Sequence, residues 1–386
     1  MRNRLIHRLV VAGFALLAAG WGLSPASAQQ TFKIGVLAPM TGGTAVVGEG
    51  SVNGIKLRLK EINNTIAGRK VELIVEDDAG DPTTGLTKAR KLAERDQVDV
   101  ILGSLLSHVV AATQDYIGQR GVPQLTLVAQ PPENAKYPTT FIPSWNAPQI
   151  GRLFGQYAYQ KLGYRNVLII SSNYVFGTRV SDGFRDGFKA AGGTIVKEIY
   201  PPLGTPDFAP FLAGLPQADA AFSFFPGGDA IRYVKARGEY GLTQKLPLLA
   251  IISTVEGMLL PAQGDAALGS LAITHYLEDH TIPMNRHFLE AYQKEYGKPA
   301  LGYYPALGYT IVQILEDALK RNGGKTAPAD LVAGIKSVDF QSNQGRFRFD
   351  PEKRYPILDF YIVKVVKKEG KFAHEVVTVF KDVKPE

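Results

Sequence analysis

The chain has 386 residues, no cysteine and a formal charge of +7. Without cysteine it has neither a disulfide framework nor a lipid attachment site, and its basic residues form no run or basic–aromatic stripe suited to a phosphate backbone. At about 150 residues per domain the length favours two domains, each large enough to bury a core, and we expect no nucleic-acid partner.

The first 28 residues have the three parts of a secretory signal peptide. Arg2, Arg4 and Arg8 precede an apolar run from residue 9 to residue 21, and Ala26-Ser27-Ala28 supplies a small-x-small cleavage site. The apolar run is too short to span a bilayer. We therefore expect export to a Gram-negative periplasm and cleavage near Ala28, which lowers the formal charge from +7 to +4 by removing three arginines and no acid. The mature chain is not expected to insert into the membrane, and an uncleaved anchor is the alternative.

Apolar runs of strand length alternate with amphipathic helical stretches, a pattern typical of parallel sheets covered by helices on both faces. The predicted elements of a first unit are, in chain order, strand 32–38, helix 47–63, strand 71–76, helix 82–96, strand 98–102, helix 109–120 and strand 123–127. After an irregular passage over 131–148, a second unit is predicted with helix 150–162, strand 167–171, helix 177–191, strands 194–200 and 220–225, helix 230–240, strands 248–252 and 272–278, helices 287–296 and 306–321, and strands 355–366 and 373–380.

Short motifs occur along the whole mature chain in a specific order and spacing. They are residues 32–42 (FKIGVLAPMTG), Asn53-Gly54, residues 61–63 (EIN), Glu76-Asp77-Asp78, Asp81-Pro82, residues 100–103 (VILG), Phe176-Gly177, Asp207-Phe208 and residues 345–350 (GRFRFD). In these motifs the chain resembles the type I periplasmic solute-binding proteins of the branched-chain amino acid ABC importer family, which bind leucine, isoleucine and valine and include an aromatic-acid-binding branch.

The resemblance implies an α/β fold of two doubly wound parallel-sheet lobes joined by three hinge crossovers. The crossovers are expected near residues 144–148, 274–277 and 351–356. The first lobe would then comprise residues 29–146 plus 277–353, and the second lobe residues 147–276 plus 354–386. The family holds its ligand in the cleft between the lobes, which close around it by hinge motion. It implies no cofactor.

The carboxyl ends of parallel strands and the helix N-termini that follow them are where such sheets bind ligands. Ser107 and His108 open the helix after strand 98–102, and the family uses the position of Ser107 to hold a carboxylate. The alternative is that Ser107 only caps its own helix. Val128 and Gln130 follow the next strand, and Gln130 replaces a small hydroxyl residue of the family. Gln130 is either a ligand contact or a plain loop residue.

Other candidate ligand contacts come from the second lobe and the crossovers. Asp229 aligns with an acidic residue that the family uses to pair with a ligand ammonium group, and its alternative role is a helix cap. Phe176 stands where the family often has tyrosine. The further candidates are Val47, which replaces an aromatic residue of the family, Phe225 in an aromatic-rich strand end, and Trp145 and Tyr276, which either stack on a ligand or pack the hinges.

Compared with the family pattern, the residues expected to bind the ligand carboxylate are retained. The residues expected around the rest of an amino acid ligand are altered and more aromatic. We therefore favour a small aromatic carboxylate such as benzoate, hydroxybenzoate or cinnamate over a branched-chain amino acid, with membrane permease subunits as partners. A ligand-sensing receptor subunit is the alternative of another class.

No enzyme motif or metal site is expected. The chain lacks a nucleophile elbow and a zinc-protease motif, and His275 and His280 are expected to face solvent. Asp77, Asp78 and Asp81 are expected to cap and solvate the helix that starts at residue 82 rather than bind a metal.

Overall fold

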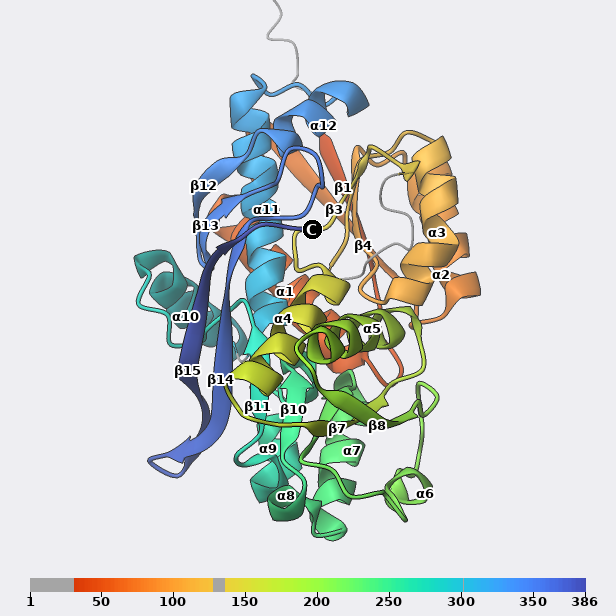
Figure 1. Ribbon diagram of the computed structural model, residues 1–386. Helices are drawn as coiled ribbons and strands as arrows, with labels where there is room; N and C mark the ends of the chain where they lie inside the picture. The colour runs from red at the N-terminus through yellow and green to blue at the C-terminus, as the bar shows by residue number, and fades with distance from the viewer. Residues whose placement is uncertain (1–30, 128–135, 301) are drawn as a thin grey trace, which may run out of the picture.

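The computed structural model describes residues 31–127, 136–300 and 302–386. The predicted signal peptide, Val128 and Gln130 lie outside these residues. Two sheets stand one above the other in Figure 1, each covered by helices. The upper sheet has six strands in the order β2-β3-β1-β4-β5-β6, and the lower sheet has seven in the order β15-β14-β11-β10-β9-β7-β8. The α/β architecture of two lobes is as predicted.

The first sheet is parallel except for the short edge strand β2. Its strands are β1 (Phe32–Ala38), β2 (Thr65–Ile66), β3 (Arg69–Asp77), β4 (Val100–Gly103), β5 (Gln124–Leu125) and β6 (Thr140–Phe141). Strand β1 is central and pairs with β3 on one side and β4 on the other. It is apolar and almost wholly buried, as expected for a strand covered on both faces.

The second sheet has a parallel centre and an antiparallel edge. Its strands are β7 (Asn166–Ser171), β8 (Thr194–Ile199), β9 (Ala220–Phe224), β10 (Leu248–Ile251), β11 (Leu271–Thr274), β14 (Leu358–Lys368) and β15 (Lys371–Val383). Strands β14 and β15 form a long hairpin beside β11. The separate hairpin of β12 (Asp339–Ser342) and β13 (Gly345–Arg348) precedes it in the chain.

Most helices begin two to four residues before the predicted starts. The α-helices that the structure describes are α1 (Ala45–Glu61), α2 (Pro82–Arg90), α3 (Ser107–Gln119), α4 (Ala147–Gln160), α5 (Val175–Ala190), α6 (Ala209–Leu212), α7 (Gly227–Glu239), α8 (Leu242–Lys245), α9 (Leu260–Gln263), α10 (Pro283–Tyr296), α11 (Tyr303–Arg321) and α12 (Pro328–Lys336), with short 3-10 helices at Ile252–Thr254 and Gly264–Ala267. First turns are rich in Pro, Gly and Ser, which are good helix starters and carry no apolar periodicity.

Three predicted elements differ from the structure. The helix predicted over 82–96 ends as an α-helix at Arg90 and continues as a π-helical turn, Lys91–Arg95. The strand predicted over 123–127 is reduced to Gln124–Leu125. The strand predicted over 272–278 ends at Thr274, whose hydroxyl accepts a hydrogen bond from the Tyr276 N–H at 3.2 Å and so replaces the sheet ladder by a local turn.

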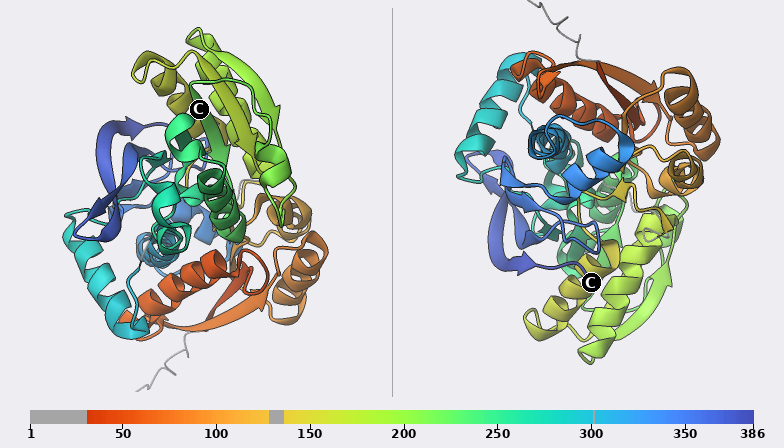
Figure 2. Two further views of the ribbon diagram at one scale, coloured as in Figure 1. Left: turned by 90° about the horizontal axis from the view of Figure 1, so that it is seen from below. Right: turned by 90° about the horizontal axis from the view of Figure 1, so that it is seen from above.

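Helices α1 and α11 pack against each other at very short range over the first sheet, and α4 packs on α5 over the second (Figures 1 and 2). Glycines make both approaches possible, because a Cβ at Gly54 or Gly183 would overlap the backbone of the facing helix. Among the helices that the structure describes, none combines the length and apolar character of a membrane span.

Candidate ligand-binding cleft

A small cavity lies between the two lobes at the ends of strands β4, β9 and β10. It is lined by Leu105, Leu106, Ser107, Tyr174, Phe176, Phe224, Pro226, Ser253, Tyr303 and Tyr304. Its volume is about 10 Å³, on the order of a single water molecule. The lobes are therefore closed on each other here, and a ligand of several heavy atoms requires them to separate.

Ser107 is the first residue of α3, and its side chain is buried in this cavity wall. The preceding residue, Leu106, occupies the N-cap position and supplies no side-chain cap. Ser107 is therefore the first helical residue of α3 and not its N-cap. The start of α3, with its positive dipole end, adjoins the cavity.

Aromatic side chains from the second lobe form the opposite wall. The rings of Phe176 and Phe224 lie 4.7 Å apart, and the Tyr174 ring is 5.9 Å from that of Phe224. Burial, with the nearby Tyr304 and Asp229, raises the pKa of Tyr174 well above its usual range. Tyr174 therefore remains a neutral phenol in a largely apolar wall.

Direct contacts join the lobes around the cavity. The Gly228 N–H at the start of α7 donates to the Gly43 carbonyl at 3.1 Å. The Ser253 and Tyr303 hydroxyls lie 3.2 Å apart within hydrogen-bond distance. The His108 ring meets the edge of Tyr174 with 5.6 Å between centroids. These contacts belong to the closed arrangement and would be lost when the lobes separate.

Known proteins share both the sequence pattern and this architecture. Residues 31–371 match the family model described as "Periplasmic binding protein". A Leu/Ile/Val-binding protein homolog 6 from Brucella melitensis is 28% identical over 349 residues, which cover 89% of each chain. The chain belongs to the periplasmic binding protein family.

Solved structures of this family are similar over nearly their whole length. A solute-binding protein of an ABC transporter from Rhodopseudomonas palustris BisB5, in complex with 3,4-dihydroxybenzoic acid, is 34% identical, with a TM-score of 0.87 over 92% of this chain and 98% of the other. A second solute-binding protein from R. palustris, in complex with 4-hydroxybenzoate, is 28% identical, with a TM-score of 0.85 over the same shares. The chain is thus a substrate-binding protein of the leucine-binding-like ABC transporter type, and such periplasmic binding proteins are not enzymes.

In the protein described by this structure, Asp229 does not line the cavity. It lies in the first turn of α7, where Pro226 takes the cap position. One carboxylate oxygen accepts the Gly204 N–H at 2.8 Å, and the other pairs with Arg232. Burial raises the pKa of Asp229 in spite of these partners. A ligand ammonium group would therefore compete with Arg232 for this carboxylate.

Several of the other candidate residues lie outside the lining of the cavity. Val47 is buried inside α1. Phe225 is buried in the second lobe, where its ring lies 4.3 Å from that of Tyr233 and its N–H donates to the Thr254 hydroxyl at 2.9 Å. The Tyr276 hydroxyl donates to the Asn285 side chain at 2.8 Å. Of the eight candidates that the structure describes, the cavity brings together Ser107 and Phe176, with His108 beside them.

The expectation for His275 was wrong, because its ring is buried between Trp145 and Tyr303. The ring centroids lie 4.7 Å from Trp145 and 5.5 Å from Tyr303. Burial lowers the pKa of His275 to about 3, so the ring stays neutral. His280, expected at solvent as well, is half-buried near Tyr361. Trp145 thus packs where the first two crossovers meet the start of α11.

Sequence reasoning missed Ser253, Tyr303 and Tyr304. Tyr303 and Tyr304 open α11, directly before Pro305, and their rings stack at 4.1 Å. Two aromatic residues between a glycine and a proline were a usable signal, since prolines are common in the first turn of a helix and helix N-termini are frequent ligand sites. Ser253 carries no such signal, because it follows an apolar strand as an ordinary loop serine.

Proposed function

We propose that this protein delivers a small aromatic carboxylate, of the benzoate or hydroxybenzoate kind, to the membrane permease of an ABC importer. The observation that carries the proposal is the composition of the cleft: Ser107 at the start of α3 on one side, and the rings of Tyr174, Phe176 and Phe224 on the other. The helix start suits a carboxylate, and the rings suit an aromatic body. The benzoate-type ligands of the two similar R. palustris proteins support the same class.

The proposed mechanism is capture by closure. A ligand that touches both lobes stabilises the closed arrangement over the open one by its differential contacts. The closed protein then docks on the permease, while this chain itself catalyses no reaction. We propose that the signal peptide directs the protein to the periplasm, where this exchange takes place.

A branched-chain amino acid is the second candidate ligand, favoured by the Leu/Ile/Val-binding names of the curated relatives. It would require an acidic partner for its ammonium group, and Asp229 is the candidate. The competition of Arg232 for Asp229 is the reason we place this ligand second. A periplasmic receptor subunit would use the same cleft and differ only in its partner.

A thermal-shift panel separates the ligand classes. We expect benzoate, 4-hydroxybenzoate or a cinnamate to raise the Tm by a few degrees, since a ligand at 100 times its Kd stabilises by about 2.7 kcal/mol. Leucine, isoleucine, valine and phenylalanine are the matched amino acid arm. A shift with the amino acids alone would overturn the aromatic assignment, and a shift with neither class would remove its support.

Ser107→Ala should weaken binding of the aromatic carboxylate by about 2 kcal/mol, close to thirtyfold in Kd, through the loss of a hydrogen bond to a charged group. Calorimetric titration measures the change. Ser51→Ala is the control, because Ser51 is also a buried helix serine but bonds only within α1, to the Val47 carbonyl at 3.1 Å. Equal Kd values for Ser107→Ala and the wild type would place the carboxylate elsewhere.

A further inference from the structure

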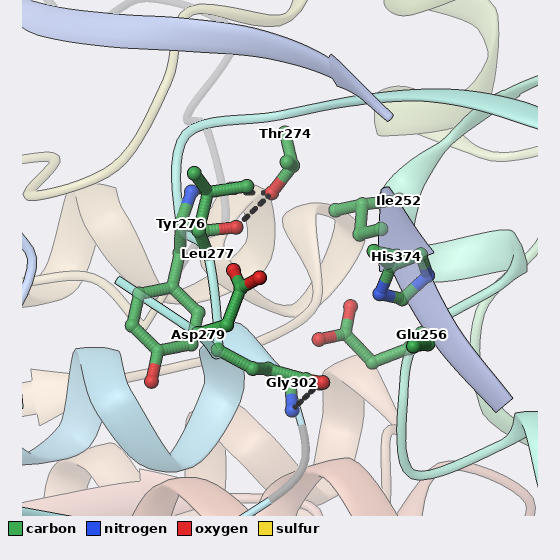
Figure 3. Close-up of a pocket in the computed structure, with 10 residues that line it drawn as sticks. Ile252, Glu256, Thr274, Tyr276, Leu277, Asp279, Gly302 and His374 are labelled. Carbon is green, nitrogen blue, oxygen red and sulfur yellow. Dashed lines mark hydrogen bonds between the residues drawn. The ribbon is translucent and has the colours of Figure 1, made fainter. Parts of the chain in front are cut away.

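A second cavity, of about 70 Å³, lies at the crossover that follows β11 (Figure 3). It is lined by Ile252, Glu256, Thr274, Tyr276, Leu277, Glu278, Asp279, Gly302, Ala373 and His374. Glu256 comes from the second lobe, just after the 3-10 turn that carries Ser253. Glu278 comes from the segment that leads into α10. The cavity thus holds two carboxyl groups at the junction of the lobes.

Both carboxyl groups bind the start of α11. Glu278 accepts the Gly302 N–H at 2.5 Å, and Glu256 accepts the Tyr303 N–H at 2.5 Å. The bond from Tyr303 to Glu256 connects the two lobes directly behind a residue that lines the ligand cleft. The fit is tight, because a Cβ at Gly302 would overlap the Glu256 carboxyl group. Separation of the lobes therefore breaks this bond and exposes Glu256 to water.

The second oxygen of Glu256 has no hydrogen-bond partner among the described residues, although the side chain is only 1% exposed. Figure 3 shows this carboxyl group pointing into the cavity between His374 and Asp279. None of the described residues that line the cavity is Lys or Arg. A charged Glu256 would be a buried anion without a compensating cation, which is costly.

The titratable groups that face Glu256 come from three segments. The crossover supplies Tyr276, Glu278 and Asp279, and α11 supplies Tyr303 and Tyr304. Strand β15 supplies His374. Its Nε2 lies 2.9 Å from the Val255 carbonyl, and burial lowers its pKa. Burial raises the pKa of both Tyr276 and Tyr303 well above their usual range. None of these groups neutralises Glu256.

Burial, followed by the nearby Glu278, raises the pKa of Glu256 well above its usual range. Burial also raises the pKa of Glu278 to about 7. A proton compensates the negative charge of these two carboxyl groups better than a metal ion does. The described residues contain no group of three His, Cys, Asp or Glu side chains arranged to hold a metal.

We propose that Glu256 takes up a proton when the lobes close, so that ligand binding is coupled to pH through the junction behind Tyr303. The inference rests on the proposed closure around a ligand. In the open arrangement Glu256 regains water and loses Glu278 as a close neighbour, and it releases the proton. Closure then takes up a proton at pH values above the ordinary range of a glutamate, because a neutral carboxyl group avoids a buried charge that no cation compensates.

The sign of the pH effect follows from this linkage. A carboxyl group whose pKa is higher in the closed form favours that form at low pH, and the advantage is lost as the pH rises through the closed-form pKa. Measured upward from about pH 6, the Kd for an aromatic carboxylate should therefore increase by up to tenfold per pH unit until the pH passes the closed-form pKa of Glu256. The ligand carboxylate stays ionised over this range.

Titration calorimetry with 4-hydroxybenzoate, in two buffers of different ionisation enthalpy, tests the proposal. The wild type should take up a proton, at most one per ligand, at pH values between the ordinary glutamate pKa and the closed-form pKa of Glu256, and it should show the pH-dependent Kd. Glu256→Gln, which is neutral at every pH, should take up fewer protons than the wild type and have a Kd that depends less on pH, because of the two carboxyl groups only Glu278 remains to titrate. Asp279→Asn removes an exposed carboxyl group at the same cavity and should retain both effects.

A pH-independent Kd in the wild type, or the same pH dependence in Glu256→Gln as in the wild type, would overturn the proposal. A Kd that changes with sodium or potassium concentration instead of pH would show that Glu256 and Glu278 bind a cation and not a proton. If 4-hydroxybenzoate does not bind at any pH, the proposed function fails. Urea unfolding without ligand then tests the protonation of Glu256 by itself. The free energy of unfolding of the wild type relative to Glu256→Gln should fall as the pH rises. A difference that does not change with pH would show that Glu256 is not protonated in the closed form.

Discussion

Phe184→Ala is expected to lower the free energy of unfolding by about 3–5 kcal/mol while leaving ligand affinity unchanged. Phe184 lies in α5 and is completely buried. Its ring stacks on Phe222 of β9 at 4.1 Å and lies 5.7 Å from Phe188. Truncation therefore removes a ring at the centre of an aromatic cluster between helix and sheet, and the rigid neighbouring rings cannot fill the cavity that remains.

Phe176, two turns earlier in the same helix, is the matched control. Its ring faces the cleft rather than this cluster. We expect Phe176→Ala to lose affinity for an aromatic ligand, with a smaller loss of stability than Phe184→Ala. Urea unfolding and calorimetric titration of both variants measure the two quantities separately. A loss below about 1 kcal/mol for Phe184→Ala would contradict the account of the cluster.

Gly54→Ala should reduce the free energy of unfolding by about 3 kcal/mol, at the upper end of the usual cost of overpacking. Helix propensity alone predicts the opposite sign, because alanine is favoured over glycine inside a helix by about 1 kcal/mol. Packing decides the outcome here. A Cβ at Gly54 would overlap the Pro305 carbonyl of α11, and the backbone of a packed helix cannot move aside as a flexible side chain can.

Gly43→Ala provides the comparison, because a Cβ at Gly43 meets nothing within 4 Å. It should change stability by less than about 0.5 kcal/mol, as most surface substitutions do. Thermal and urea unfolding of both variants test the pair. A stabilised Gly54→Ala variant would show that α1 and α11 can separate without cost. Because α11 begins at Tyr303, such a result would also mean that this part of the cleft wall can move.

The closed cleft and the carboxyl pair share one structural element, the start of α11. Tyr303 lines the cleft with its side chain, while its backbone N–H is held by Glu256. The Trp145 ring packs on Tyr303 with 4.9 Å between centroids. Ligand contact, hinge packing and the proposed proton uptake therefore meet within one helical turn, so a change in any of them acts on the same backbone.

The order of strands and helices could be predicted from the sequence because each element carries its own local pattern. Strand β1 reads as a continuous apolar run and lies at residues 32–38 as predicted. Ser107 was correctly placed at the start of a helix after a strand, since turn and strand signals are local. The family resemblance was confirmed as well, because it rests on motifs spread over nearly the whole mature chain.

The contacts between residues that are distant in sequence were decided by the tertiary structure alone. His275 was expected at solvent, and only the meeting of two crossovers with α11 buries it. Asp229 is engaged by a neighbouring loop and by Arg232, which alignment by position cannot show. Glu256 and Glu278 carry no motif, and the burial of Glu256 beside Glu278 depends on how the lobes pack. Periodicity determines which face of an element is buried, whereas the partners across that face are set by the packing of the whole chain.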